Sequence, residues 1–313
     1  MTHTARQRLA LFAAAAVLAT VSGCSAPSDE VAEEGDVFVG ADGDTIETAD
    51  ATRIVTLSGD LTEFVFELGL GTSLVATDVT TVAPEEAVAL PKAGIGRFLT
   101  AEGVLKHDPT LVIGDTQTSP LSTIEQIRAA GVPVAILPVA TTFDGLYDKV
   151  TALGRLLDRP GEAQALNERL RSEVEEASSV RADLESQPRI AYVYTRGPDV
   201  MLLFGEGMTT TPLIEAAGGL DAGVDAGVEG TVTVTPEALA AAAPDVIIVP
   251  SEGFGVLGGV DGLLAIPGIA ATPAGIERAI LDYPEGDFLT FGPRIAQSID
   301  LLSEDLSILL EAP

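Results

Sequence analysis

The chain has 313 residues, of which 46% are hydrophobic, so it is long enough for two domains or for one large domain with a sizeable core. Its formal net charge of −30 argues against nucleic acid and anionic membrane surfaces as binding partners. The single cysteine, Cys24, excludes an intramolecular disulfide.

The first 24 residues have the pattern of a secretory signal. Two arginines precede an apolar run from Leu9 to about Val21, and this run is shorter than the roughly 20 residues that a transmembrane helix needs. It ends in Val-Ser-Gly-Cys, which resembles the bacterial lipobox, whose cysteine is lipidated and becomes the new N-terminus. The resemblance implies that residues 1–24 are a lipoprotein signal peptide and that Cys24 carries the lipid.

Residues 25–52 are acidic and rich in small side chains, and no Lys or Arg occurs between Cys24 and Arg53. Such a segment cannot bury much apolar surface, so we expect a flexible tether here.

A short pattern then occurs twice, as TAEGVLKHDPTLVIG from Thr100 and as TPEALAAAAPDVIIV from Thr235. In both copies Glu follows the Thr by two positions, and Pro follows it by nine. The Thr suits a helix N-cap, the Glu suits the first turn, and the Pro ends the helix. The apolar run that follows is typical of a strand buried on both faces. Each copy therefore predicts a helix, a turn and a buried strand.

The duplication extends upstream, because RIVTL at Arg53 and RIAYV at Arg189 precede the two copies by 47 and 46 residues. Each of these strand-like openings leads to a loop and to a helix that ends in glycine. Alternating strands and helices predict parallel sheets with right-handed crossovers. We therefore expect two α/β lobes of similar plan, residues 53–141 and 188–313, although a chance similarity between such short segments stays open.

Residues 142–187 lie between the predicted lobes. Apolar residues recur at helical spacing in the first part: Leu146, Val150, Leu153 and Leu157. Pro160 suits the first turn of a second helix, which is long and charged and which we interpret as a spacer between the lobes. Two α/β lobes create a cleft between the carboxyl ends of their strands, where ligands bind in this class of architecture.

The lipobox, the duplicated lobes and the connecting helix together resemble the substrate-binding lipoproteins of ABC importers. The resemblance covers about Arg53 to the C-terminus and is greatest for the helix-linked subclass, whose members carry cobalamin, ferric siderophores or haem. The haem-uptake branch is indicated by DVTTVAPEEAVALPKAGIGRFLTAEGVL, YTRG, GGVDGLLAIPGIAATPAG and FGPR.

The resemblance implies two Rossmann-like α/β lobes with parallel sheets, joined by one long rigid α-helix, with a ligand cleft between the lobes. It also implies a monomer, lipid-anchored outside the cytoplasmic membrane or periplasmic, that delivers its ligand to an ABC permease and its ATPase. In this family two glutamates, one per lobe, dock onto arginines of the permease, and Glu102 and Glu237 match those positions. The alternative is that each Glu only complements its helix dipole.

The resemblance assigns the ligand site to YVYTRG, which closes the first strand of the second lobe. A Tyr-x-Arg at this place provides an axial tyrosinate and its supporting arginine in haem-binding members, which implies that Tyr194 ligates the haem iron and that Arg196 supports it. Tyrosinate is a known haem ligand, and a nearby cation favours the phenolate. The alternative is a Tyr packed at a strand end beside a solvated Arg.

The opposing lobe departs from the family pattern, because Arg97 stands where many members carry a Tyr or His ligand. Arg cannot ligate iron, but it can pair with a propionate. Either Tyr194 binds the iron alone, or the ligand is a ferric siderophore or another porphyrin-like molecule. An anionic siderophore would suit Arg97, Arg196 and Arg294, whereas Tyr283 could offer a flat ligand an aromatic wall, or belong to the core.

Catalysis and bare metal binding are not expected. The sequence has no G-x-S-x-G elbow, no Cys nucleophile in the body and no Walker or dinucleotide glycine pattern. His107, which we expect on a solvated turn, is the only His after the signal, and zinc sites prefer several N or S ligands. We expect a binding protein that captures haem b as a transported ligand. An enzyme on the same architecture and a lipid-anchored adhesion module remain alternatives.

Overall fold

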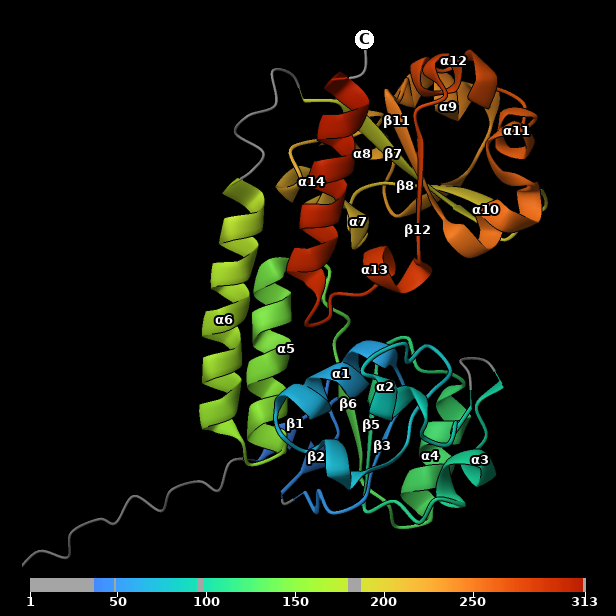
Figure 1. Cartoon of the computed structure of the whole chain (residues 1–313). Coiled ribbons are helices and arrows are strands. Elements are labelled where there is room, and N and C mark those ends of the chain that lie inside the picture. The colour runs from blue at the N-terminus through green and yellow to red at the C-terminus, as the bar shows by residue number, and fades with distance from the viewer. Residues whose placement is uncertain (1–36, 48, 95–97, 180–186, 312–313) are drawn as a thin grey trace, which may run out of the picture. The chain divides into compact units, whose positions relative to one another are not determined.

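The computed structural model describes residues 37–47, 49–94, 98–179 and 187–311 (Figure 1). A four-stranded sheet and a six-stranded sheet, each accompanied by helices, organise most of this part of the chain. We call them, with their helices, the N-terminal lobe and the C-terminal lobe. Among the described residues, no helix has both the length and the apolar character that crossing a membrane requires.

The N-terminal lobe contains a parallel sheet in the order β4-β3-β5-β6. Its strands β3, β5 and β6 are buried along their whole length, as the apolar runs predict. The strands are β3 (Ile54–Thr56), β4 (Leu74–Ala76), β5 (Leu111–Asp115) and β6 (Val134–Leu137). The helices are α1 (Gly59–Glu67), η1 (Gly71–Ser73), α2 (Glu85–Val88), α3 (Ala101–Leu105) and α4 (Leu121–Ala129).

A hairpin of β1 (Phe38–Val39) and β2 (Thr45–Ile46) lies within the segment expected to be a flexible tether. The Ile46 side chain is buried, and two acidic side chains of the hairpin, Asp42 and Asp44, form ion pairs of 2.8 Å with Arg128 of α4. This part of the predicted tether is therefore folded. The acidic composition suggested a tether because the cation that pairs with these residues lies 80 or more positions further along the chain.

Two helices, α5 (Phe143–Leu156) and α6 (Pro160–Ser179), connect the lobes and pack side by side. Thr142 caps α5 by accepting a hydrogen bond from the Gly145 amide, and Pro160 begins α6 as predicted. The last helix, α14 (Ile295–Glu311), also packs on α6. One hydrophobic core includes residues of both sheets, α5, α6 and α14, so α6 is supported along its apolar face rather than standing alone as a spacer.

The C-terminal lobe contains a mixed sheet in the order β10-β8-β7-β11-β12, with β9 paired to β7. The prediction of parallel strands holds for β7, β9, β11 and β12, whereas β8 pairs antiparallel with both of its neighbours, β7 and β10. The reason is a tight turn after β7, in which the Arg196 amide donates to the Val200 carbonyl and Gly197 adopts a φ of +113°. A turn this short can only reverse the strand direction.

The strands of this lobe are β7 (Arg189–Thr195), β8 (Met201–Phe204), β9 (Leu220–Asp221), β10 (Thr231–Thr233), β11 (Val246–Pro250) and β12 (Ile280–Tyr283). The helices are α7 (Thr210–Ala216), α8 (Ala222–Asp225), α9 (Pro236–Ala242), α10 (Ser251–Leu257), α11 (Gly259–Leu264), η4 (Ile269–Ala271), α12 (Pro273–Glu277) and α13 (Glu285–Leu289).

The repeated sequence has the same structure in both lobes. Thr100 caps α3 and Thr235 caps α9, each accepting a hydrogen bond of 3.1 Å from the amide three residues later. Eight positions after each Thr the backbone turns left-handed, with φ of +48° and +40°. The arginine at the start of the first strand then donates to carbonyls at this turn: Arg53 to His107 and Asp108, and Arg189 to Ala242.

Candidate functional site

The two residues predicted to hold the ligand meet at the carboxyl end of β7. The Nε of Arg196 donates a hydrogen bond of 2.6 Å to the Tyr194 hydroxyl, and the Tyr194 ring stacks on Phe204 at a centroid distance of 6.0 Å. Tyr194 is half-buried and Arg196 is exposed, so the pair is accessible from solvent. The hydrogen bond that Arg196 donates to Tyr194 is the main cause that raises the pKa of the Arg196 guanidinium.

A third residue completes this group, because the Nη2 of Arg196 also pairs with the Glu285 carboxylate at the first turn of α13. Burial raises the pKa of Glu285, and the guanidinium opposes that shift. The three side chains form a chain from phenol to guanidinium to carboxylate. Sequence reasoning missed Glu285, although its place directly after β12 and Pro284, at the carboxyl end of a parallel strand, could have suggested it.

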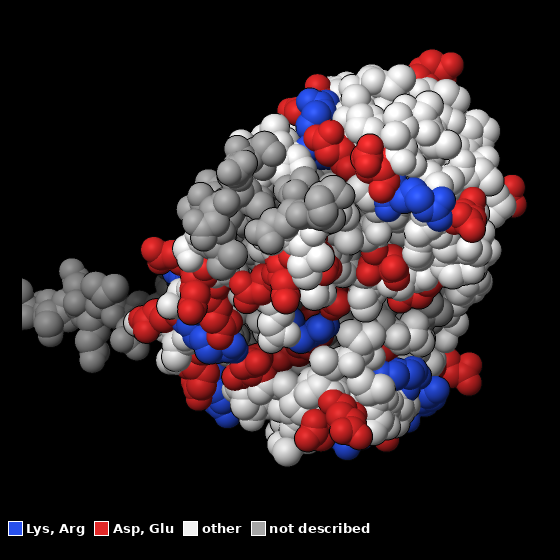
Figure 2. All heavy atoms as spheres, turned by 45° about the horizontal axis from the view of Figure 1, so that its top comes forward, with Lys and Arg blue, Asp and Glu red and all other residues white. Residues whose placement is uncertain are grey.

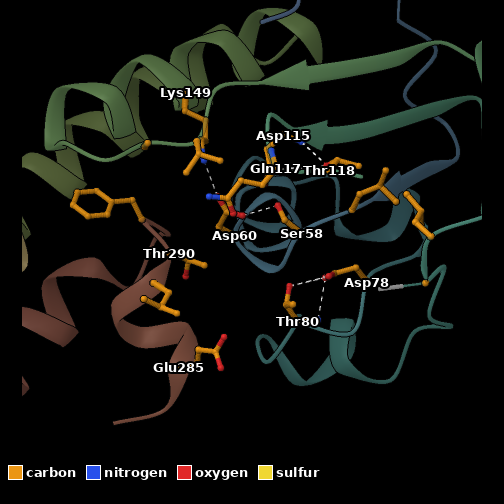
Figure 3. A pocket seen from close by; sticks show the side chains of 17 residues that line it. Ser58, Asp60, Asp78, Thr80, Asp115, Gln117, Thr118, Lys149, Glu285 and Thr290 are labelled. Atoms are coloured by element: carbon orange, nitrogen blue, oxygen red, sulfur yellow. Dashed lines mark hydrogen bonds and ion pairs between the residues drawn. The ribbon is translucent and has the colours of Figure 1, made fainter. Parts of the chain in front are cut away.

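A cavity of about 290 Å³ lies at the carboxyl ends of the strands of the N-terminal lobe, and residues of the α13 region complete its lining (Figure 3). Among the described residues that line it, four are acidic and one is basic: Asp60, Asp78, Asp115 and Glu285 against Lys149. Tyr194 and Arg196 do not line this cavity, but their partner Glu285 does. Glu285 is therefore shared between the tyrosine–arginine pair and the cavity.

A buried ion pair stands at the inner wall of the cavity. The Nζ of Lys149 on α5 lies 2.8 Å from Oδ2 of Asp60 on α1, and both side chains are under 10% exposed. Burial opposes the ionisation of Asp60, but the charge of Lys149 and hydrogen bonds from Lys149 and Ser58 outweigh it and hold the pKa of Asp60 below its usual range. The sequence signal was a lysine beside Val150 in the apolar stripe of α5.

The other two aspartates of the cavity, Asp78 and Asp115, have no cationic partner within salt-bridge distance among the described residues. Burial is the main cause that raises the pKa of both Asp78 and Asp115 above the ordinary value. Asp78 accepts hydrogen bonds from the hydroxyl and the amide of Thr80, and Asp115 accepts one of 2.9 Å from the Gln117 amide. The cavity therefore presents carboxylates and hydroxyls, a poor environment for an anion.

Arg294, which we expected to contact an anionic ligand, is paired with two carboxylates of the protein instead. Its guanidinium makes two hydrogen bonds, of 3.0 and 3.1 Å, to the carboxylate of Glu63 on α1 and a third of 3.1 Å to Asp287 on α13. It does not line the acidic cavity. Its partners lie 231 and 7 positions away in the sequence, and the first of these could not be foreseen.

Tyr283, expected as an aromatic wall, is a core residue. Its side chain is buried, its hydroxyl donates a hydrogen bond of 2.6 Å to Asp305 of α14, and its ring stacks on the buried Phe288 at 4.7 Å. Exposed apolar side chains stand instead in segments that follow strands: Val79 and Val82 in the loop after β4, Leu121 at the start of α4 and Val256 in α10. Val256 lies over Gly197, next to Arg196.

The predicted docking glutamates occupy equivalent places. Glu102 and Glu237 are exposed in the first turns of α3 and α9, and neither carboxylate has an ion-pair or hydrogen-bond partner among the described residues. Acidic side chains are spread widely over the face in Figure 2, in keeping with the net charge. His107 lies beyond α3, at the amino end of β5, and thus away from the cavity.

Two predicted residues, Arg97 and Cys24, lie outside the described residues. Among the residues that the structure describes, no group of three or more His, Cys, Asp or Glu side chains is arranged to hold a metal ion.

The comparisons with known proteins agree with this architecture. The family described as periplasmic binding protein matches residues 54–286. The chain belongs to this family. A solved structure of the periplasmic heme-binding protein RhuT from Roseiflexus sp. RS-1, in apo form, is 38% identical, with a TM-score of 0.79 over 83% of this chain and 99% of that one. The heme-binding protein HmuT is 33% identical, with a TM-score of 0.81 over 86% of this chain and 89% of HmuT.

Solved variants of HmuT replace one Tyr and, separately, an Arg two positions further on, which is the spacing of Tyr194 and Arg196. A curated relative, the cobalamin-binding protein of Halobacterium salinarum, is 26% identical over 246 residues. The match covers 75% of this chain and 62% of that protein, so the chain spans less than two thirds of the length of this relative. The family and these neighbours are binding proteins.

Proposed function

We propose that this periplasmic binding protein captures haem outside the cytoplasm and delivers it to an ABC permease and its ATPase. The observation that carries the proposal is the hydrogen bond from Arg196 to the Tyr194 hydroxyl at the carboxyl end of β7. The similarity to heme-binding proteins at 33% and 38% identity supports it. Capture and delivery require no covalent step, and we propose no catalytic role.

The chemistry of the pair fits a ferric iron. A phenol ionises at a pH of about 10 in water, and both a ferric ion and an adjacent guanidinium favour the phenolate. Tyrosinate is one of the side chains that hold haem iron. Because the Nε of Arg196 donates to the Tyr194 oxygen, a lone pair of that oxygen remains for the metal. Tyr194 is thus the axial ligand in our proposal, and Arg196 is its support.

The surroundings favour a flat, largely apolar ligand over an anionic siderophore. Of the described residues that line the cavity beside the pair, four are acidic and one is basic, and Arg294 is already paired with carboxylates. The exposed apolar residues in segments that follow strands, such as Leu121 and Val256, suit the edge of a macrocycle. A cobalamin-like ligand remains the second candidate because of the cobalamin-binding relative.

The other assignments are proposals that support this function. Lipidation of Cys24 would hold the protein at the outer face of the membrane, and Glu102 and Glu237 would dock the two lobes on a two-fold symmetric permease. Their equivalent exposure in α3 and α9 supports the docking role. A monomer suffices for this mechanism, and the predicted lobe boundaries, 53–141 and 188–313, remain predictions.

A hemin titration of the purified protein, followed in the Soret and visible bands, tests the ligand. We expect a saturable spectrum with a tyrosinate charge-transfer band that disappears in Tyr194→Phe. Tyr192→Phe is the matched control, because the Tyr192 hydroxyl is buried without a hydrogen-bond partner in the described part of the chain. A spectrum identical to that of free hemin, or a band that persists in Tyr194→Phe, would refute the assignment.

A further inference from the structure

Glu285 has a place that the ligand hypothesis alone does not explain. Its carboxylate pairs with the Nη2 of Arg196, while the Nε of the same guanidinium donates to the Tyr194 hydroxyl. Glu285 and Arg196 are 26% and 49% exposed, so the carboxylate is the better anchored partner. Because an exposed arginine loses much rotamer freedom when it is held in one geometry, the orientation of Arg196 on Tyr194 depends on such an anchor.

The backbone holds this carboxylate in place. Glu285 begins α13, and its amide donates a hydrogen bond of 3.3 Å to the Glu252 carboxylate of α10. Three residues later, Phe288 is fully buried, and its carbonyl accepts a hydrogen bond of 3.1 Å from the Thr209 hydroxyl. Both contacts fix α13 against the rest of the C-terminal lobe, so Glu285 can act as a fixed point for Arg196.

Glu285 lies among several charged side chains, of which one is a cation in direct contact. The charged groups that face Glu285 are Arg196 after β7 and Glu252 on α10, and the cavity adds its aspartates and Lys149. Among these, Arg196 is the one cation in ion-pair contact with Glu285 in the described structure.

We propose that Glu285 is a positioning residue, which holds the Arg196 guanidinium on the Tyr194 hydroxyl. The proposal rests on the proposed function, in which Tyr194 is the axial ligand. It assigns an orientation role to the carboxylate, which acts through Arg196 and not on the ligand itself.

The orientation role is tested by hemin affinity. The amide oxygen of Glu285→Gln still accepts a hydrogen bond from Arg196, so we expect an affinity within about threefold of the wild type. Glu285→Ala removes the acceptor and should weaken binding about tenfold, which is the effect of losing one charge-assisted hydrogen bond. Recovery in the Gln variant separates positioning from a general disturbance of α13.

Two results overturn the proposal: wild-type hemin affinity in Glu285→Ala, or an equal loss in Glu285→Ala and Glu285→Gln. Either result, with hemin still bound by the wild type, refutes the orientation role and leaves the proposed function intact. If the wild type does not bind hemin at all, the proposed function fails and the orientation role fails with it. If Glu285→Ala does not fold, Glu285→Ser, whose side chain is too short to reach Arg196, replaces it.

Discussion

The two lobes repeat the same plan at one edge of their sheets and differ completely at the other. At the amino edge, each lobe has a Thr-capped helix, a left-handed turn and an arginine that donates to carbonyls at that turn. At the carboxyl edge, the C-terminal lobe has the Tyr194–Arg196 pair, whereas the N-terminal lobe has the acidic cavity with its buried Asp60–Lys149 pair.

The edge that is the same in both lobes serves the fold, and the edge that differs serves ligand binding. The shared edge contains the strand pairings and the helix caps that any such lobe needs, and it leaves Glu102 and Glu237 in matching positions. Ligand chemistry depends on the carboxyl edges, where side chains can change without altering the sheet. The following predictions test this division, from the largest expected effect to the smallest.

Breaking the ion pair of the N-terminal lobe should have the largest effect on stability. In Lys149→Met, Asp60 stays buried without its cation, and we expect a loss of about 3–5 kcal/mol in the free energy of unfolding. Urea unfolding followed by circular dichroism measures it. Adding Asp60→Asn should recover most of the loss, since no uncompensated charge then remains.

A matched control is Arg169→Met, because Arg169 pairs with Glu67 and Glu173 on the surface. Its loss should be below about 1 kcal/mol. Equal effects of Lys149→Met and Arg169→Met would mean that the buried pair has no special structural role, and the acidic cavity would then be free to act in binding.

Breaking the carboxyl edge of the C-terminal lobe should affect binding instead of stability. We expect Tyr194→Ala to weaken hemin binding at least about 100-fold, because the axial ligand is lost, while the unfolding midpoint in urea stays near that of the wild type. Asp115→Asn in the cavity should change hemin affinity less than about threefold. Isothermal titration at one pH compares the hemin affinities of the two variants. A larger loss of affinity in Asp115→Asn than in Tyr194→Ala would assign the binding site to the N-terminal lobe.

The sequence was sufficient for the features that depend on neighbouring residues. The Thr caps, the buried strands of both copies and the start of α6 at Pro160 follow from local patterns, and the structure has them. The Tyr194–Arg196 contact also joins residues two positions apart. Local chemistry was sufficient in each case because the partners are close in the chain.

What the sequence could not provide is the choice of distant partners. Arg294 looked available for an anion, but Glu63 takes its guanidinium, and Tyr283 looked like an aromatic wall, but Asp305 accepts from its hydroxyl. The folding of residues 37–47 depends in the same way on Arg128. A charged or aromatic side chain can contact a ligand only when it is not already bound to another side chain of the protein. The sequence pattern does not identify that other side chain.

The shared edge can be tested through the glutamates that it presents. We expect the double variant Glu102→Lys with Glu237→Lys to reduce hemin uptake in cells about tenfold or more, and each single variant less, because exposed ion pairs contribute only about 0–1 kcal/mol each. Hemin affinity of the purified double variant should be unchanged. Normal uptake by cells that carry the double variant would leave the glutamates with a role only at their helix dipoles.

The smallest effect concerns the pH dependence of stability in the acidic cavity. Because burial raises the pKa of Asp115 above its unfolded value, its share of the stability is present below about pH 4 and is lost as the pH rises through the raised value. Asp78 and Glu63 act in the same direction, whereas Asp60, with its lowered pKa, contributes stability that is lost as the pH falls through that lowered value.

The wild type should lose stability between about pH 4.5 and pH 7 as Asp115 ionises. We therefore expect the loss in Asp115→Asn over the same range to be smaller by about 1 kcal/mol or less. The asparagine can still accept the hydrogen bond from the Gln117 amide, so the comparison isolates the charge. Urea unfolding at the two pH values measures the change. An identical pH dependence in both proteins would mean that Asp115 ionises as readily in the folded protein as in the unfolded chain, so that burial does not raise its pKa.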